Sequence, residues 1–523
     1  MDLQREIHAL LEQTSSGRMT SAAYDTAWIA RLTALGEPMG ERALEWLREN
    51  QLPNGSWGTR EPCYYHDRLV CTLSALTALS INGDERDRDR LRRALAGFDT
   101  ALRGLIADPV GATIGFEMIA PTLMAEAKAI GMIRRYENGV LNEAISHYDA
   151  ALKTPLVQGD LRRRHGNDYL DQLSYQRLAK LRALPEGKIN RYVTVAFSAE
   201  MAGLEGINLF DIAHLQEKNG SVGHSPSASA YFALSVRPGD PAALAYLRQL
   251  VDPEDGSVPF AAPFDIFERT WVLWNLLLAS PLDEAVTALL QPHLDFIQAA
   301  WRPGLGVGFS IEYTPVDGDD TSVAFEVLLR CGRSVDVEAL HHYEMKDRFR
   351  CYELEANPSI SVNCHMLSAL FQAGYAIDHP SVQKIRAFLK RTRLLGMYWF
   401  DKWHISPYYP TGHAVIAMAD YEDNLALKAV DWILETQNHD GSWGYYGPTA
   451  EETAYCIQAL IYWQRNHGKL PVNVLPRGLA WLADHSEPPY PPLWIGKCLY
   501  SPTLVTRSAI LSALLLGEQE EIL

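Results

Sequence analysis

The sequence lacks long apolar runs, an excess of positive charge and paired cysteine motifs, and each absence excludes a class of protein. No stretch of about 18 uncharged apolar residues occurs, so we expect no transmembrane segment, and the N-terminal MDLQREIHAL has no signal-peptide core. The net charge of −17 argues against nucleic acid or an anionic membrane surface as a partner. The seven cysteines are never spaced C-x-x-C, which indicates reduced thiols in a cytoplasmic protein.

What the sequence does contain is helical periodicity. Segments such as AVDWILETQ (429–437) and TAYCIQALIYW (453–463) carry apolar residues three and four positions apart, and Gly, Pro or Asp interrupts them. Alternating strand patterns are scarce. A chain of 523 residues is too long for one hydrophobic core. The sequence therefore predicts an all-α protein of two or three domains.

Two internal repeats near opposite ends of the chain refine this prediction. Residues 43–58 (ALEWLRENQLPNGSWG) and 429–444 (AVDWILETQNHDGSWG) share eight of sixteen positions and the frame Q-x-x-x-G-S-W-G. Degenerate copies with Val in place of Trp lie at 216–222 and 252–258. Gly permits a turn after a helix, and repeated helix pairs stack on their neighbours. The repeats predict two related α-barrels and carry no chemistry themselves.

Three aspartates lie together in TPVDGDDTSVAF (314–325), directly before an apolar helical pattern. Carboxylates this close repel one another, and burying one in its charged form costs several kcal/mol unless it is paired. Asp317, Asp319 and Asp320 therefore either hold a metal, or one of them keeps its proton. An N-cap cluster in a solvated loop is a further alternative. The glycine and distal glutamate of an EF-hand calcium loop do not follow at the required spacing.

The Q-x-x-x-G-x-W repeats and the D-x-D-D tetrad together resemble the class II terpene cyclases, which begin their reaction by protonation. The nearest resemblance is to bacterial diterpene cyclases that form halimadienyl (tuberculosinyl), kolavenyl or copalyl diphosphate. Further segments resemble the family in the same order along the chain: SAAYDTAW (21–28), CYYHDRLVCTLSALTAL (63–79), IGFEMIAPTL (114–123), NGSVGHSPSASAYF (219–232), DKWHISPYY (401–409) and PLWIGKCLY (492–500). The likeness covers nearly the whole chain.

The resemblance implies a fold of two (α/α) barrel domains, called β and γ, with the active site at the domain interface. In this family the γ domain is inserted after the first helix of the β domain. Residues 1–20 would then be the first helix of β, and residues 21–290 would form γ. Residues 291–523 would complete β and contain the aspartate tetrad.

The resemblance also assigns the acid. Protonating an isolated alkene requires an acid that is neutral, dry and aimed at one carbon. Asp319 matches the family's proton donor, with Asp317 and Asp320 as electrostatic neighbours. His365 would orient the Asp319 carboxyl group and help to reprotonate it. Ser361 lies four residues before His365, on the same face of a predicted helix. The alternative for His365 is a core histidine with an ordinary hydrogen bond.

The remaining site residues follow from matching family segments. Glu117 matches an acidic position that is linked to Mg²⁺ and the substrate diphosphate. Basic residues that would contact the diphosphate, although lysines are usually solvated, are Arg68, Lys188, Lys402 and Lys497. Aromatic rings stabilise carbocations through their quadrupole. The candidate rings, which could equally belong to the core, are Tyr231, Trp271, Trp274, Trp399, Trp403 and Tyr408.

The expected product keeps its diphosphate, because the motifs with which class I terpene synthases ionise allylic diphosphates do not appear. A downstream class I terpene synthase or a phosphatase would then consume it. In plant ent-copalyl synthases a His–Asn pair removes the last proton, and the resemblance of LEG (204–206) and WVLWN (271–275) to those segments places Ala202 and Asn275 at these positions. Loss of that base favours a rearranged halimane- or clerodane-type diphosphate made from geranylgeranyl diphosphate. The alternatives are a copalyl diphosphate synthase and a squalene–hopene-type triterpene cyclase.

Two other helical proteins fit the sequence less well. A protein prenyltransferase subunit shares the α-barrel, but the spacing of its zinc ligands is not found here. A scaffold of helical repeats would explain the repeats, but it would not explain three clustered aspartates before an apolar helix.

Overall fold

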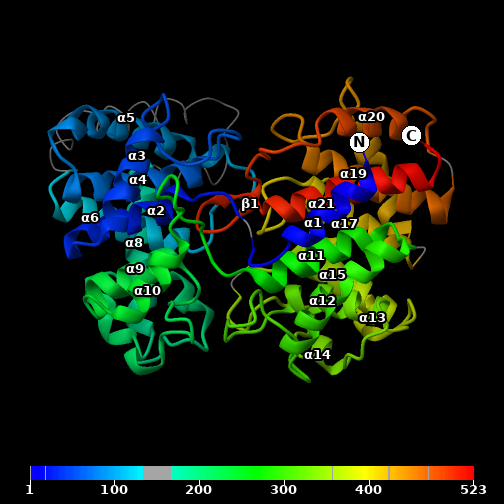
Figure 1. The fold of residues 1–523 in the computed structure, drawn as a ribbon, viewed down its shortest axis with the longest axis horizontal. Coiled ribbons are helices and arrows are strands. Elements are labelled where there is room, and N and C mark those ends of the chain that lie inside the picture. Colours follow the sequence, from blue (N-terminus) through cyan, green and yellow to red (C-terminus); the bar gives the residue numbers. More distant parts are fainter. Residues whose placement is uncertain are drawn as a thin grey trace. The chain divides into compact units, whose positions relative to one another are not determined.

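The computed structural model describes residues 2–17, 19–132, 166–355, 357–421, 424–468 and 470–522. Part of the predicted γ domain, residues 133–165, lies outside this range. The described residues are mainly helical, and their one sheet is the small pair β1 (Trp494–Ile495) and β2 (Leu499–Tyr500) (Figure 1). The prediction of an all-α fold is confirmed.

The chain divides into two compact units. Unit 1 comprises residues 1–19, 263–494 and 501–523, and unit 2 comprises residues 20–262 and 495–500. The first boundary lies one residue before the expected one, and the division differs more substantially in two other places. Unit 1 resumes at Pro263 rather than at residue 291, because α11 (Asp265–Leu278) packs against α13 (Gly318–Arg330) and α21 (Thr503–Gln519). The short segment 495–500, which was expected in β, belongs to unit 2.

Six inner helices of unit 1 form a closed ring, in which each helix packs against the next and the last against the first. In ring order they are α11, α13, α15 (Ile360–Gln372), α17 (Tyr408–Ala419), α19 (Ala450–His467) and α21. Outer helices cover this ring: α1 (Leu3–Gln13), α12 (Glu284–Ala300), α14 (Glu338–His341), α16 (Pro380–Thr392), α18 (Leu427–Glu435) and α20 (Val474–Asp484). The ring is an α/α barrel.

The sequences of the inner and outer helices explain their positions. Every residue of α17 (YYPTGHAVIAMA) is buried, as expected for a helix that is apolar on all sides. In α16 the buried residues Val382, Ile385, Phe388 and Leu389 recur every three or four positions, while Lys and Arg occupy the other face. A ring of largely buried helices inside a layer of amphipathic ones follows from these two patterns.

Unit 2 contains a second closed ring. Its members are α2 (Ala23–Ala30), α4 (Tyr65–Asn82), α6 (Phe116–Ala129), the 3₁₀ segment Thr194–Ala202 and α9 (Pro226–Tyr231). Outer helices pack on the ring: α3 (Pro38–Glu49), α5 (Arg88–Gly104), α8 (Gly166–Ala183) and α10 (Pro241–Leu250). Each unit is thus a barrel of helix pairs, as the repeats predict.

The repeats tie consecutive helices together through hydrogen bonds. In unit 1 the Gln437 side-chain amide donates to the carbonyl groups of Gly441 and Val474, each at 2.9 Å. The Trp443 indole N–H donates to the carbonyl of Ile433 at 2.7 Å. Unit 2 repeats the arrangement with Gln51, Gly55, Arg90, Trp57 and Leu47. These bonds satisfy carbonyl groups at helix ends that would otherwise be buried without a donor.

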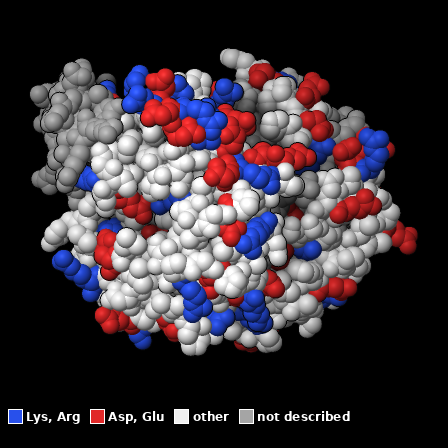
Figure 2. All heavy atoms as spheres, turned by 60° about the vertical axis from the view of Figure 1, so that its left-hand side comes forward, with Lys and Arg blue, Asp and Glu red and all other residues white. Residues whose placement is uncertain are grey.

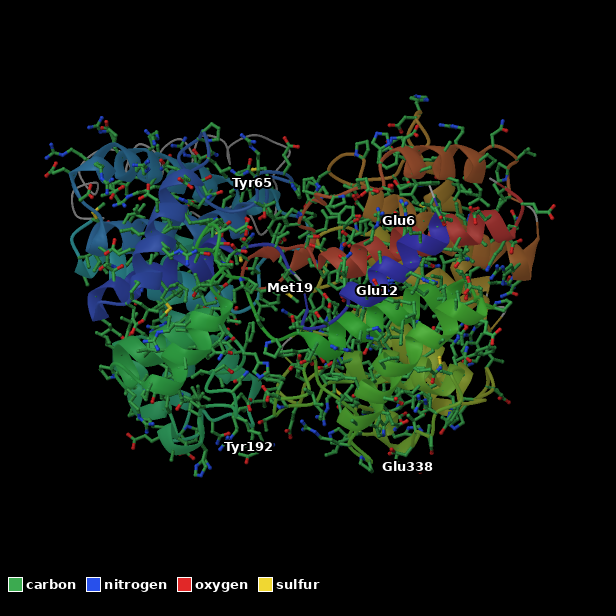
Figure 3. The ribbon with its side chains drawn as sticks, in the orientation of Figure 1. Glu6, Glu12, Met19, Tyr65, Tyr192 and Glu338 are labelled. Atoms are coloured by element: carbon green, nitrogen blue, oxygen red, sulfur yellow. The ribbon has the colours of Figure 1, made fainter. Side chains whose placement is uncertain are left out.

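The N-terminal helix α1 lies beside α21 in unit 1 (Figure 1). Glu6 of α1, labelled in Figure 3, forms an ion pair of 3.0 Å with Arg507 of α21. On the face drawn in Figure 2, basic and acidic side chains are interspersed. Of the helices in the described ranges, none has the length and apolarity that a membrane span requires.

Candidate active site

The aspartate tetrad forms the start of α13. Asp317 is the N-cap residue, and its Oδ1 accepts hydrogen bonds from the backbone N–H groups of Asp319 (3.0 Å) and Asp320 (2.8 Å). Its side chain is buried, unlike that of a solvated cap. The N-cap interpretation and the acid interpretation therefore describe the same structure, since the cap fixes the backbone that carries Asp319.

The three carboxyl groups differ in their surroundings. Asp317 and Asp320 are buried, whereas the side chain of Asp319 remains 13% exposed. Burial raises the pKa of Asp317 to about 7, and burial together with the nearby Asp317 raises the pKa of Asp320 well above its usual range. Burial and the neighbouring carboxyl group therefore favour the protonated, neutral form of Asp320. The cluster then carries less negative charge than three ionised aspartates, and the helix N-terminus stabilises what remains.

His365 lies within hydrogen-bond distance of Asp319. Its Nδ1 is 2.6 Å from Asp319 Oδ1, and its ring is buried on α15. Asp401 holds the start of this helix, because it accepts hydrogen bonds from the Ile360 N–H and from the Ser361 hydroxyl, each at 2.7 Å. The structure thus brings His365 to the tetrad, and it directs the Ser361 hydroxyl to Asp401. The catalytic role of Ser361 stays a prediction.

A second histidine, His413 on α17, extends this contact. Its Nδ1 lies 2.6 Å from His365 Nε2, and its ring is buried. Sequence reasoning missed His413, although a signal was present. It is the one imidazole in a helix that is otherwise apolar or weakly polar, and a buried imidazole needs a hydrogen-bond partner.

Aromatic rings surround His365. Trp271 lies edge-on at 5.6 Å between ring centroids, and Trp274 lies at 6.1 Å. Tyr409 lies at 6.4 Å, and Trp274 also stacks on His413 at 4.8 Å with an interplanar angle of 24°. Two of the six predicted cation-stabilising rings, Trp271 and Trp274, are therefore beside His365, the hydrogen-bond partner of Asp319.

The other four predicted rings have different surroundings. Trp399 is fully buried, and its indole N–H donates to the Leu389 carbonyl at 2.9 Å. Trp57 and Trp443 of the repeats make the same kind of hydrogen bond, to a carbonyl ten residues earlier. Tyr408 stacks on Trp432 at 4.7 Å. Trp403 is half-buried beneath the Lys402 ammonium group, which lies 4.7 Å from its ring. In unit 2 the hydroxyl of Tyr231 donates to the Gly203 carbonyl at 2.6 Å. Their part in catalysis stays a prediction.

Asn275, the predicted partner of a terminating base, is buried in unit 1 with its amide fully engaged. It donates to the Trp271 carbonyl and to the Ser508 hydroxyl, both at 3.0 Å, and accepts from the Gln458 amide at 3.2 Å. Ala202 ends a 3₁₀ segment of unit 2 and is fully buried. Within unit 1, Asn275 therefore holds three inner helices together.

Two of the four predicted diphosphate ligands, Arg68 and Lys497, are buried in unit 2. The Arg68 guanidinium donates to two backbone carbonyls and one hydroxyl of residues 56–60. The ammonium group of Lys497 is fully buried, 2.6 Å from Glu200 Oε1, and donates to two serine hydroxyls at 2.7 and 2.8 Å. Both groups therefore already have acceptors from the protein.

The other two candidates are more accessible. Lys188 is exposed in unit 2. Lys402 lies in unit 1 with 23% of its side chain exposed, 2.5 Å from Glu355 Oε1. The structure therefore distributes the four basic residues over both units, and their role toward a diphosphate stays a prediction.

Glu117, the predicted magnesium ligand, is half-buried at the start of α6 and accepts from Lys180 at 3.2 Å. Mg²⁺ commonly takes one or two carboxylates and completes its shell with water and substrate phosphates, so a single accessible carboxylate suits this mode of binding. The described residues also contain one compact group of three potential metal ligands, Asp67, Cys71 and Cys498. Thiols do not suit Mg²⁺, and both Asp67 oxygens accept backbone N–H groups, so this buried group has a structural explanation.

Comparisons with known proteins place this geometry in context. Residues 336–487 match the family described as the squalene-hopene cyclase C-terminal domain. The chain is 43% identical over 521 residues to a type B diterpene cyclase from Mycobacterium tuberculosis, with 98% of each sequence covered. It is 30% identical to a (+)-kolavenyl diphosphate synthase from Herpetosiphon aurantiacus, over 96% of this chain and 95% of the relative. Among solved structures, the ent-copalyl diphosphate synthase from Streptomyces platensis superposes with a TM-score of 0.75 at 30% identity, over 99% of both chains.

Proposed function

Because the chain belongs to the class II diterpene cyclases, we propose that it converts geranylgeranyl diphosphate into a bicyclic diphosphate by protonating the terminal alkene. The observation that carries this proposal is the 2.6 Å contact between Asp319 and His365 at the N-terminus of α13. A single, partly exposed carboxyl group, held by an imidazole among aromatic rings, suits proton transfer to an alkene.

In the proposed first step the O–H bond of Asp319 breaks and a C–H bond forms at the alkene carbon. The carboxylate that remains is stabilised by the N-terminus of α13, whose backbone N–H groups carry partial positive charge. The raised pKa of Asp320 favours its neutral form, which adds no charge that would oppose this ionisation. Asp317 contributes by capping the helix, which fixes the position of the acid.

The carbocation formed in this way needs neighbours that stabilise positive charge without attacking it. The faces of Trp271 and Trp274 are proposed for this role, and their position beside His365 supports it. Tyr231, Trp399, Trp403 and Tyr408 remain candidates on the family resemblance alone. Because a single positioned acid protonates one alkene carbon, the positive charge forms at one position, next to rings that can stabilise it.

Substrate binding is proposed to depend on the diphosphate. Glu117 would hold Mg²⁺, which would neutralise part of the diphosphate charge when bound. Lys188 and Lys402 have the accessibility that a ligand contact needs, whereas Arg68 and Lys497 would have to give up protein acceptors. A product that retains its diphosphate would pass to a class I terpene synthase or to a phosphatase.

We further propose a rearranged, halimane- or clerodane-type skeleton. The argument rests on Ala202, where an aligned histidine base would stop the reaction at the copalyl stage. The kolavenyl and ent-copalyl relatives, each at 30% identity, do not favour one skeleton over the other. A copalyl diphosphate is therefore the alternative, and Ala202→His is expected to divert part of the product toward it.

The test is incubation with geranylgeranyl diphosphate and Mg²⁺, followed by analysis of the products by mass spectrometry and NMR with and without phosphatase treatment. We expect a bicyclic alcohol that appears only after phosphatase treatment. Farnesyl diphosphate, a C25 diphosphate and squalene serve as competing substrates. A hydrocarbon released without phosphatase, or turnover of squalene alone, would overturn the proposal.

A further inference from the structure

A chain of three side chains, Asp319, His365 and His413, crosses from α13 through α15 to α17. Two contacts of 2.6 Å link them, one at each nitrogen of the His365 ring. His365 and His413 are both buried, so water does not compete for the contact between them. The role inferred below for His413 rests on the proposed function, in which Asp319 must carry a proton before each turnover.

His413 is electrically neutral near neutral pH. Burial, and to a smaller extent the neighbouring His365 and His404, lower its pKa well below the usual range for histidine. A neutral imidazole has one N–H group and one acceptor nitrogen. In the hydrogen bond between His413 Nδ1 and His365 Nε2, the donor is therefore either His413 or His365.

The two directions have opposite consequences for the acid. If His413 Nδ1 accepts, His365 carries hydrogen on Nε2 and offers Nδ1 as the acceptor for the Asp319 carboxyl proton. If His413 Nδ1 donates, His365 Nε2 is an acceptor, and the one hydrogen of a neutral His365 lies on Nδ1 facing Asp319 Oδ1. In the first arrangement the lone pair of His365 Nδ1 can take up a proton and pass it to Asp319 while Nε2–H stays in place. In the second, Nδ1 already carries a hydrogen and can accept none, although the acid can hold its own proton on Oδ2.

The surroundings of His413 favour the first arrangement. His413 Nε2 has no hydrogen-bond partner among the described residues. It must carry the ring hydrogen when Nδ1 accepts. Aromatic rings lie around it, with Tyr409 at 4.4 Å and Tyr455 nearly perpendicular at 5.6 Å. An N–H group interacts weakly but favourably with aromatic faces, whereas an acceptor nitrogen gains nothing from them.

Trp274 fixes the plane of the His413 ring. Its indole stacks on His413, and its own N–H is held by Glu326 Oε2 of α13 at 3.0 Å.

Titratable groups surround His413 on several elements: α13, α15, α17, α19 and the loop before α17. They are Asp319 and Glu326 of α13, His365 of α15, His404 of the loop, Tyr409 of α17, and Glu451 and Tyr455 of α19. Glu451 accepts from Tyr455 and Trp494 at 2.9 and 2.7 Å.

We infer that His413 is a positioning residue for the reaction: its Nδ1 accepts from His365 Nε2–H and so keeps His365 Nδ1 as the nitrogen that restores the acidic proton of Asp319 after each turnover. When that proton passes to the alkene, Asp319 is left as a carboxylate. The proton released by the last carbocation balances the one consumed, so no other reactant is required.

The test compares His413→Phe with His413→Asn. Phe keeps a ring for Trp274 to stack on but removes the acceptor, whereas the Asn side-chain oxygen can supply an acceptor at the position of Nδ1. We expect kcat to fall about 10- to 100-fold in the Phe variant, as is usual when a group that orients a catalytic residue is lost. The KM for geranylgeranyl diphosphate should stay within about twofold, and Asn should restore part of kcat. His293→Phe, at another buried histidine of unit 1, is the control and should leave kcat unchanged.

A second measurement does not depend on turnover. Nitrogen-15 NMR of histidine-labelled wild-type protein reports which nitrogen of His365 carries hydrogen, and His365→Asn identifies its signals. We expect hydrogen on Nε2 in the wild type, and a change in the signals of His365 in His413→Phe. A wild-type His365 with hydrogen on Nδ1 alone, or an unchanged kcat in a folded His413→Phe protein, would overturn the inference. Wild-type protein that fails to cyclise geranylgeranyl diphosphate would instead overturn the proposed function.

Discussion

Replacing Asp319 by Asn tests the acid directly, because the two side chains have nearly the same shape. The carboxyl group is replaced by an amide that cannot give up a proton to an alkene. Loss of a general acid commonly costs about 10²- to 10⁴-fold in rate, which corresponds to about 3–5 kcal/mol of transition-state stabilisation. Since protonation begins the proposed reaction, we expect the loss in kcat to lie at or beyond the upper end of this range.

The fold should tolerate the same change. Among the described residues the Asp319 carboxyl group has one hydrogen-bond partner, His365 Nδ1, and the Asn amide can donate to the same nitrogen. Its side chain is also partly exposed, so no large cavity or unpaired charge results. We therefore expect the free energy of unfolding to change by less than about 1 kcal/mol, and Tm by less than about 4 °C.

The assay follows product formation from geranylgeranyl diphosphate, together with thermal denaturation and binding of the substrate measured by tryptophan fluorescence. Asp420→Asn is the matched control, since it removes another partly buried carboxyl group of unit 1 and should leave kcat unchanged. A folded Asp319→Asn protein that binds substrate and keeps more than about a tenth of the wild-type kcat would refute the assignment of Asp319 as the acid.

Three other predictions concern the scaffold. Trp443→Phe removes the indole N–H bond to Ile433 and should lower the free energy of unfolding by about 1–3 kcal/mol, and so Tm by several degrees. Trp481→Phe, at a half-buried ring, is the control and should lower Tm less in the same melting experiment. Lys497→Met leaves Glu200 as a buried carboxylate without its cation and should destabilise unit 2 by about 3–5 kcal/mol in urea titrations, an effect that Lys188→Met should lack. Burial raises the pKa of Asp420 from 3.8 to about 7, so the folded state binds more protons than the unfolded state from about pH 4 to about pH 7, and this group's contribution to stability falls as the pH rises through that window. Asp420→Asn removes this dependence, so the Tm of the variant relative to wild type should rise between about pH 5 and about pH 8; a constant difference would contradict the assigned pKa.

Local sequence patterns predicted most of the secondary structure and the start of the acidic motif. The three- and four-residue apolar spacing marks the helices, and Asp317 precedes an apolar run as an N-cap residue does. These features depend on contacts between residues close in sequence, which a single sequence displays. The division at Pro263 was not predicted, because α11 is apolar on most sides and its sequence does not say which ring it completes.

The candidate site shows the same limit. His365 was found because a family segment marks it, whereas His413 was missed because its importance depends on a partner 48 residues away. Lys497 was assigned to the diphosphate, yet its nearest carboxylate is Glu200, 297 residues earlier in the chain. Burial and pairing of charged groups are properties of the tertiary fold. Nothing in the sequence around Lys497 distinguishes a solvated lysine from one enclosed with a carboxylate.

The six residues 495–500 also affect the order in which the protein can be completed during synthesis. They belong to unit 2, although most of unit 1 is translated between Ala262 and Ile495. Until Lys497 leaves the ribosome, Glu200 has no cation in its buried position, and an unpaired buried carboxylate is strongly destabilising. Most of unit 2 is translated first, but its interior charge is balanced only after Lys497 has left the ribosome. A nascent chain halted after Ala262 should therefore bind chaperones more strongly than the released chain of 523 residues.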